Sequence, residues 1–88
     1  MGTKPRARPQ RLAAKLLAIR TYLELSQSQL ARRLDPDLSP ARISEFEHGT
    51  REPTVMVLLR YSEISRVSME MIINDRIDLH QFQFQLEQ

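Results

Sequence analysis

The sequence predicts an all-α fold, a bundle of five short helices. The first apolar series, Leu12, Leu16, Ile19 and Leu23, is spaced by four, three and four residues, as on one face of a helix. Further along, Ser or Thr precedes each of four more segments with helical patterning, and such residues favour helix starts. A chain of 88 residues has room for one core only, so multi-domain enzymes and large ligand-binding barrels are excluded.

The first helix is expected over residues 10–25. Lys15 and Arg20 fall off the apolar face defined by the leucines, although Leu17 and Tyr22 widen this face. Residues 1–9 contain Pro5 and Pro9 among basic side chains. Because proline interrupts helices and little in this segment can be buried, residues 1–9 are predicted to form a flexible basic arm.

Two strong start signals predict the next two helices. Ser26 opens a capping box, so the second helix is expected over residues 27–34. Ser39 is followed by Pro40, a combination that favours the first turn of a helix, and the third helix is expected over residues 40–48. Two short helices joined by a tight turn form a candidate helix-turn-helix.

Thr54 and Ser68 are expected to cap the fourth and fifth helices. The fourth helix would end near Ile64. Its predicted inward residues are Val55, Leu58, Leu59 and Ser62. The predicted buried residues of the fifth helix are Met69, Ile72 and Ile73.

The C-terminal residues follow a different period. Phe82, Phe84 and Leu86 alternate with glutamines, and this period of two favours a strand. A single strand is not stable alone, so it would pair with its copy in a second subunit. The alternative is an irregular tail that packs its two aromatic rings. We expect these three residues and Ile73 to contribute to a homodimer.

Charge is distributed unevenly along the chain. Residues 1–20 hold six basic and no acidic residues, whereas residues 21–88 hold seven basic and eleven acidic ones. A basic end on an acidic body suggests a polyanionic partner for that end, and a solvated tail is the alternative. The arginines in this segment favour phosphate, because the guanidinium group matches phosphate oxygens.

Several function classes lack support in the sequence. The chain has no Cys, which fits a cytoplasmic protein and excludes thiolate chemistry and Cys-ligated metal sites. No apolar run is long enough for a membrane span, and no apolar segment follows the basic start as in a secretory signal. His48 and His80 lack ligand-spaced partners, and no catalytic motif is present. We therefore expect no enzyme activity, no metal and no cofactor.

Three motifs carry a family resemblance. They are Leu25–Ala31 (LSQSQLA), Ile43–Gly49 (ISEFEHG) and Arg51–Pro53 (REP). Together, at this spacing, they resemble the phage repressor/Cro-type (Xre) helix-turn-helix family over about residues 10–74. The resemblance implies a DNA-binding domain that acts as a dimer on a palindromic operator, with the third helix in the major groove. We accordingly expect a transcriptional regulator, a dimeric repressor that binds double-stranded DNA.

The resemblance also implies roles for individual residues. The implied base-contacting residues are Pro40, Ala41, Arg42, Ser44 and Glu45. The implied phosphate contacts are Gln27, Ser39 and Arg51, with Lys4, Arg6, Arg8 and Arg11 at the N-terminal end. For Gln27 the alternative is a cap residue of the second helix. Arg20 and Glu47 match a family pair that ties the first helix to the recognition helix.

Two departures from the family keep an alternative open. The turn over residues 34–38 is longer than the family's and lacks its glycine, and residues 21–53 hold six acidic residues against four basic ones. The alternative is a protein-interaction module, such as an antitoxin that binds a toxin, with weak or non-specific DNA binding. In either case the expected organisation is an arm (1–9), a helix-turn-helix domain (10–74) and a C-terminal tail (75–88).

Overall fold

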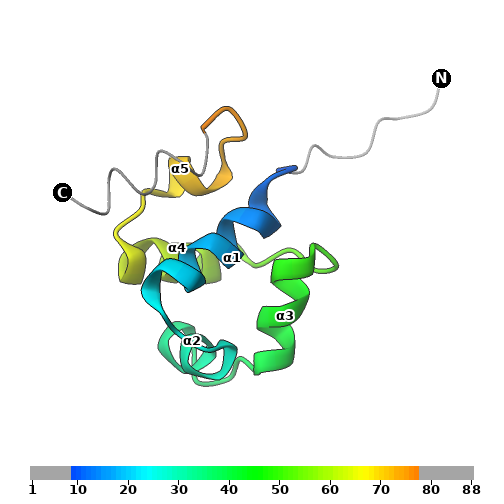
Figure 1. The fold of residues 1–88 in the computed structure, drawn as a ribbon, viewed down its shortest axis with the longest axis vertical. Helices are drawn as coiled ribbons and strands as arrows, with labels where there is room; N and C mark the ends of the chain where they lie inside the picture. Colours follow the sequence, from blue (N-terminus) through cyan, green and yellow to red (C-terminus); the bar gives the residue numbers. More distant parts are fainter. Residues whose placement is uncertain (1–8, 78–88) are drawn as a thin grey trace.

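The computed structural model describes residues 9–77, and over these residues the fold is all-α with five helices. The helices are α1 (Leu12–Leu23), α2 (Gln27–Leu34), α3 (Pro40–His48), α4 (Val55–Ser65) and α5 (Met69–Ile73). α1 runs through the middle of the domain and contacts α3, α4 and α5, whereas α2 packs on α3 and α4 (Figure 1). The predicted strand lies outside the described residues.

Local capping explains where most helices begin and end. Ser26 and Gln29 form both bonds of the predicted capping box, at 3.0 and 2.8 Å. Ser39, Thr54 and Ser68 each accept a hydrogen bond from the amide three residues further on. Gly49 ends α3 with a φ of 77°, a left-handed conformation that costs glycine little.

α1 is shorter at both ends than predicted. Glu24 adopts a φ of 59° and its amide bonds back to the carbonyls of Arg20 and Thr21, which ends the helix at Leu23. A left-handed glutamate gives no strong signal in sequence, since glycine or asparagine is the usual residue at such a position.

The predicted inward face of α4 was correct at Leu58 but wrong at Val55 and Leu59. Val55 is 70% exposed and Leu59 is also exposed, whereas Leu58, Tyr61 and Ser65 are buried. The helix is therefore rotated so that residues spaced by three and four, beginning at Leu58, face the core. The ring of Tyr61 is fully buried in the core.

Burial differs from the simple apolar pattern at two further residues. Lys15 lies off the apolar face of α1, yet it is fully buried, because three other helices cover α1. Its amine reaches the end of α5, where it finds hydrogen-bond partners. Ile73 was expected to be buried, but it is exposed in the last turn of α5, while Ile72 fills the core.

The long turn between α2 and α3 is closed by its own residues. The Asp35 carboxylate accepts from the amide of Asp37 at 2.9 Å, and the Asp35 carbonyl accepts from the amide of Leu38 at 3.0 Å. Leu38 then packs against the core. Arg60 of α4 donates to the carbonyl of Leu34 at 3.2 Å, so the end of α2 is also held by α4. The turn is therefore closed by these bonds without a glycine.

Candidate nucleic-acid interface

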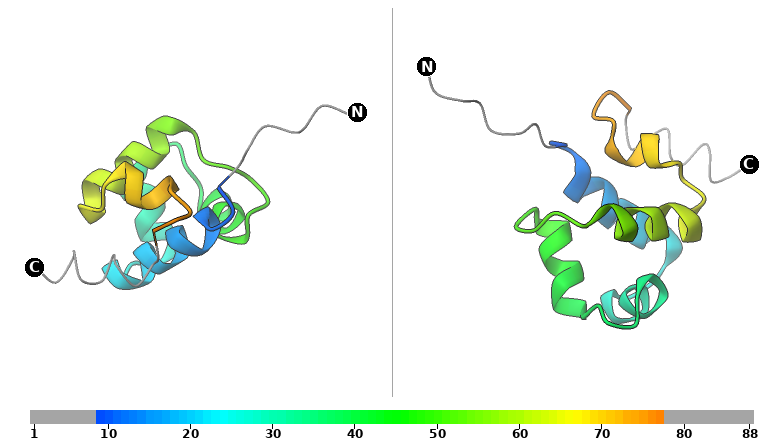
Figure 2. Two further views of the ribbon diagram at one scale, coloured as in Figure 1. Left: turned by 90° about the horizontal axis from the view of Figure 1, so that it is seen from above. Right: turned by 180° about the vertical axis from the view of Figure 1, so that it is seen from behind.

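The helix-turn-helix unit lies at one end of the domain. α2 and α3 pack on each other and lie on the side of α1 opposite to α5 (Figures 1 and 2). The inner side of α3 is fixed by Ile43 and Phe46, which are both buried in the core. The residues between and before these positions therefore form the outer side of α3.

The first turn of α3 is open to an approaching surface. Pro40 and Ala41 are exposed and small, so a flat partner can come close to the helix at this point. Ser39 is also exposed, and its hydroxyl accepts from the amide of Arg42 at 3.1 Å as the N-cap. A phosphate contact by Ser39 would therefore add to its capping role.

Glu45 brings two arginines together on the outer side of α3. Its Oε1 accepts from Nε of Arg51 at 3.1 Å and forms an ion pair with Nε of Arg42 at 3.0 Å. All three side chains are about half exposed. Arg51 comes from the loop after α3, so this bridge joins α3 to that loop. We call the three residues the Glu45 bridge.

Ser44 and His48 occupy the same side of α3, one turn apart. His48 Nδ1 lies 2.8 Å from the Ser44 carbonyl oxygen and 3.3 Å from its hydroxyl oxygen. The contact to the carbonyl implies that Nδ1 carries the proton and donates. The imidazole therefore sits over the end of α3, next to the surface made by the Glu45 bridge.

The inner end of α3 is held by a buried ionic group. Arg20 of α1 donates Nε to Oε2 of Glu47 at 2.7 Å and Nη2 to Oε1 at 3.1 Å, and its Nη1 donates to the carbonyl of Leu25 at 3.0 Å. The Glu47 side chain is only 4% exposed. The hydrogen bond from Arg20 to Glu47 holds the pKa of Arg20 above its ordinary value. The pair fixes α3 relative to α1.

Gln27 completes this group from the start of α2. Its Nε2 donates to Oε1 of Glu47 at 3.1 Å. Side chains of α1, α2 and α3 thus meet at one carboxylate. The side chain of Gln27 is half-buried, at the N-terminal end of α2, where backbone amides favour an anion.

A comparison with protein families identifies the domain. The helix-turn-helix family profile matches residues 16–72, well over half of the chain. The chain belongs to this family. It is a DNA-binding helix-turn-helix domain of the Cro/Xre type, as the three motifs had indicated. No curated protein and no solved structure shows significant similarity to the chain.

The helix-turn-helix domain contains only part of the predicted site. Lys4, Arg6, Arg8, Phe82, Phe84 and Leu86 lie outside the described residues. Arg11 is exposed immediately before α1. Between residues 9 and 77, no helix is long and apolar enough to cross a membrane. Within the same range, no group of three or more acidic or histidine side chains could hold a metal ion.

Sequence patterns did not reveal the polar contacts of Lys15 and Asp75 or the burial of the Tyr61 hydroxyl. Lys15 bonds to Met71, which lies 56 residues away, and Asp75 bonds to Gln10, which lies 65 residues away. Contacts between residues so distant in the sequence leave no local pattern. The buried hydroxyl of Tyr61 has no hydrogen-bond partner among the described residues. Burial, and then the negative charge of Glu47, raise the pKa of Tyr61 well above its usual range.

Proposed function

We propose that the protein is a cytoplasmic dimeric repressor that reads an inverted-repeat operator with α3. The single observation that carries this proposal is the contrast between the two sides of α3. Its inner side is locked by Ile43, Phe46 and the Arg20–Glu47 pair, while its outer side is exposed from Pro40 onward. A rigid helix with an exposed outer side is what major-groove reading requires.

The outer residues suit base edges of different kinds. Arg42 can donate two hydrogen bonds to guanine, Glu45 can accept from the amino group of cytosine, and Ala41 can touch a thymine methyl group. Pro40 and Ser44 would line the same contact. In the free protein Nε of Arg42 forms an ion pair with Oε1 of Glu45, and base contact by either side chain would compete with this pair.

Phosphate contacts would flank the reading helix on both sides. Gln27 and Ser39 lie at the starts of α2 and α3, and Arg51 lies beyond the end of α3. The basic residues at the N-terminal end, Lys4, Arg6, Arg8 and Arg11, would supply further contacts. These contacts would add affinity without sequence preference, because every phosphate group is alike.

Selection from a random duplex pool tests this function. At about 150 mM salt, non-specific binding is weakened by competing counterions, so enrichment reports sequence reading. We expect an inverted repeat whose half-site centres are about 34 Å apart, one helical turn of DNA. Recovery of unselected sequences only would overturn the proposal.

A substitution in α3 tests whether this helix does the reading. Arg42→Ala should change the selected sequence at one position in each half-site, since a bidentate contact discriminates by about 1–3 kcal/mol. Arg76→Ala is the matched control, because it removes the same charge from an exposed residue after α5. An unchanged preferred sequence in the Arg42→Ala protein would show that another element reads the bases.

Dimer formation needs its own measurement. Ile73 is exposed at the end of α5, where a partner could cover it, and Phe82, Phe84 and Leu86 follow in the chain. We expect Phe82→Ser with Phe84→Ser to convert a dimer to a monomer in analytical ultracentrifugation. The control Gln83→Ser should leave the dimer intact. A monomeric wild-type protein would contradict dimeric reading.

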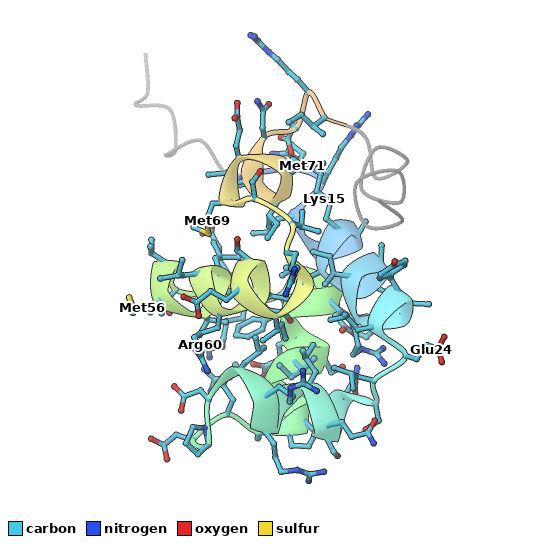
Figure 3. The ribbon with its side chains drawn as sticks, turned by 90° about the vertical axis from the view of Figure 1, so that its left-hand side faces the viewer. Lys15, Glu24, Met56, Arg60, Met69 and Met71 are labelled. Atoms are coloured by element: carbon cyan, nitrogen blue, oxygen red, sulfur yellow. The ribbon has the colours of Figure 1, made fainter. Side chains whose placement is uncertain are left out.

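The exposed side of α4 supports a second candidate, a protein-interaction module. Val55, Met56 and Leu59 are all exposed, and Met56 lies at the outer edge of α4 beside Arg60 (Figure 3). Contiguous exposed apolar patches can mark sites of protein–protein interaction. This candidate, such as an antitoxin that binds a toxin, predicts no enriched operator. It also predicts that Met56→Lys abolishes binding to a protein partner.

A further inference from the structure

His48 lies on the outer side of α3, one turn beyond Ser44. Residues of a helix are about 100° apart around its axis, so His48 is about 140° from Ile43 and about 160° from Phe46. Those two residues are the buried ones of α3. Ala41, Ser44 and His48 are spaced by three and four residues, so they form one line on the opposite side. His48 is exposed at the C-terminal end of this line.

One ring nitrogen of His48 is already engaged within the helix. Nδ1 lies 2.8 Å from the carbonyl oxygen of Ser44, and this short contact places the proton on Nδ1. The Ser44 hydroxyl lies 3.3 Å from Nδ1 and can donate to it only in the other tautomer. In that tautomer the lone pair of Nδ1 would face the carbonyl oxygen, so two acceptors would be in contact. Nε2 is therefore the nitrogen that remains for a partner, and in a neutral imidazole it carries a lone pair.

The surroundings of His48 leave its charge open to change. Within residues 9–77 no acidic side chain pairs with it. The charges of the Glu45 bridge are paired with one another on the same helix, and Glu52 in the following loop lines a groove beside α1. From α1 and α2, Arg20 and the neutral Gln27 face the buried Glu47 on the inner side of α3. An incoming partner would therefore supply the main new charge near the imidazole.

DNA offers hydrogen-bond acceptors to such a nitrogen. Phosphate oxygens only accept, and so do N7 and O6 of guanine in the major groove. A neutral Nε2 would meet these groups lone pair to lone pair. A protonated imidazole donates from both nitrogens, so it can contact the DNA and keep its bond to Ser44. Contact between Nε2 and any of these acceptors is therefore coupled to the uptake of one proton.

We propose that His48 is a further DNA contact of α3 and takes up a proton as it binds, so that affinity for duplex DNA rises as the pH falls. Nε2 then donates to an acceptor of the DNA, which is a phosphate oxygen or the edge of a guanine. This inference rests on the proposed function, since that function brings the outer side of α3 against duplex DNA. Histidine suits this coupling, because its side chain changes charge between about pH 5 and pH 8.

The test measures affinity at constant salt between about pH 6 and pH 8, where histidine changes charge and most carboxylates do not. The probes are a fluorescent duplex of random sequence and a selected operator. We expect the wild-type affinity to rise by up to about tenfold per subunit for each unit that the pH falls, since one proton is taken up. His48→Gln stays polar but does not titrate, so it should lose this dependence. His80→Gln is the matched control, because it removes the only other histidine of the chain and should keep the dependence.

A second variant and a second readout sharpen the test. His48→Lys carries a positive charge throughout this pH range, so at about pH 8 it should bind more tightly than the wild type. A phosphate acceptor gives the same pH dependence with both duplexes. It also makes the wild-type salt slope at about pH 6 steeper than that of His48→Gln by up to about 0.9. A guanine acceptor gives the pH dependence with the operator alone.

Other results separate the failure of this inference from that of the proposed function. If the wild-type protein binds neither duplex, the proposed function fails and the inference fails with it. If the protein binds but its affinity is independent of pH with both duplexes, only the role of His48 is overturned. A pH dependence that persists in His48→Gln would also overturn this role, since another group would then take up the proton. Weaker binding of His48→Lys than of the wild type at about pH 8 would count against a DNA contact at this position.

Discussion

Arg20 of α1 binds both carboxylate oxygens of Glu47 of α3, at 2.7 and 3.1 Å. Both side chains are largely buried, so the loss of one partner leaves an uncompensated charge in the domain. We expect Arg20→Ala to destabilise the fold by about 3–5 kcal/mol. Glu47→Ala should cost a similar amount, since Gln27 would also lose its acceptor.

Urea unfolding of the two variants measures this cost. Glu63→Ala is the matched control, because its pair with Arg60 joins two half-exposed side chains and should contribute at most about 1 kcal/mol. The double variant Arg20→Met with Glu47→Leu should recover much of the lost stability, since no charge is then stranded. Equal stability of Arg20→Ala and Glu63→Ala would show that the pair does not hold α3.

Tyr61 leads to a prediction about alkaline stability. Its hydroxyl is buried without a partner among the described residues, and burial raises its pKa far above the value of about 10 in an unfolded chain. A group whose pKa is raised by folding contributes stability that is present below the unfolded pKa and is lost as pH rises beyond it. The wild-type protein should therefore lose stability above about pH 10.

Tyr61→Phe should remove this alkaline loss. At neutral pH the variant should be as stable as the wild type or more stable, because a buried hydroxyl without a partner costs about 1–3 kcal/mol. Tyr22→Phe, at an exposed position, should keep the alkaline loss. Thermal melts at neutral pH and above pH 10 make the comparison. A strong loss of stability at neutral pH in Tyr61→Phe would mean that the hydroxyl has a partner after all.

The local parts of this fold were predictable from sequence, and the long-range parts were not. Ser26, Ser39, Thr54 and Ser68 each lie within three residues of the amide they cap, so their role is visible in the pattern. The rotation of α4 was not visible, because apolar residues occur on both sides of this helix. Val55 fits an inward pattern as well as Leu58 does, and only packing against α1 and α2 decides between them.

The candidate site shows the same division. The outer residues of α3 follow from the motifs and from helix geometry, and Ile43 and Phe46 fix which side faces outward. Two polar contacts of the domain were not predicted from the sequence. Arg51 bonds to Glu45 from the loop after α3, and Asp75 bonds to Gln10, which lies 65 residues earlier in the sequence. Neither contact therefore leaves a pattern of fixed spacing.

Lys15 should contribute to stability as a buried donor. Lys15→Met keeps most of the apolar stem but leaves the carbonyls of Met71 and Asn74 without this donor. We expect a loss of about 1–3 kcal/mol, with faster amide exchange in α5 than in α2. Arg32→Met, at an exposed position of α2, should change stability by less than about 0.5 kcal/mol. Unchanged exchange in α5 would show that Lys15 does not hold this helix.

Glu45 should limit non-specific DNA binding. In the free protein its Oε1 forms ion pairs with both Arg42 and Arg51, so one carboxylate engages two guanidinium groups on the outer side of α3. Glu45→Gln removes the negative charge and weakens both bonds, because a neutral amide oxygen is a poorer acceptor for a guanidinium group. Both arginines then become available to phosphate without first breaking an ion pair.

We therefore expect Glu45→Gln to bind random duplex DNA more tightly than the wild type. Its salt slope should be steeper by up to about 1.8, since each additional phosphate contact contributes about 0.9. Preference for the selected operator should fall, because non-specific binding gains while the cytosine contact is lost. Glu52→Gln is a control for charge in the same loop as Arg51. An equal gain from Glu45→Gln and Glu52→Gln would show that net charge, rather than the Glu45 bridge, limits non-specific binding.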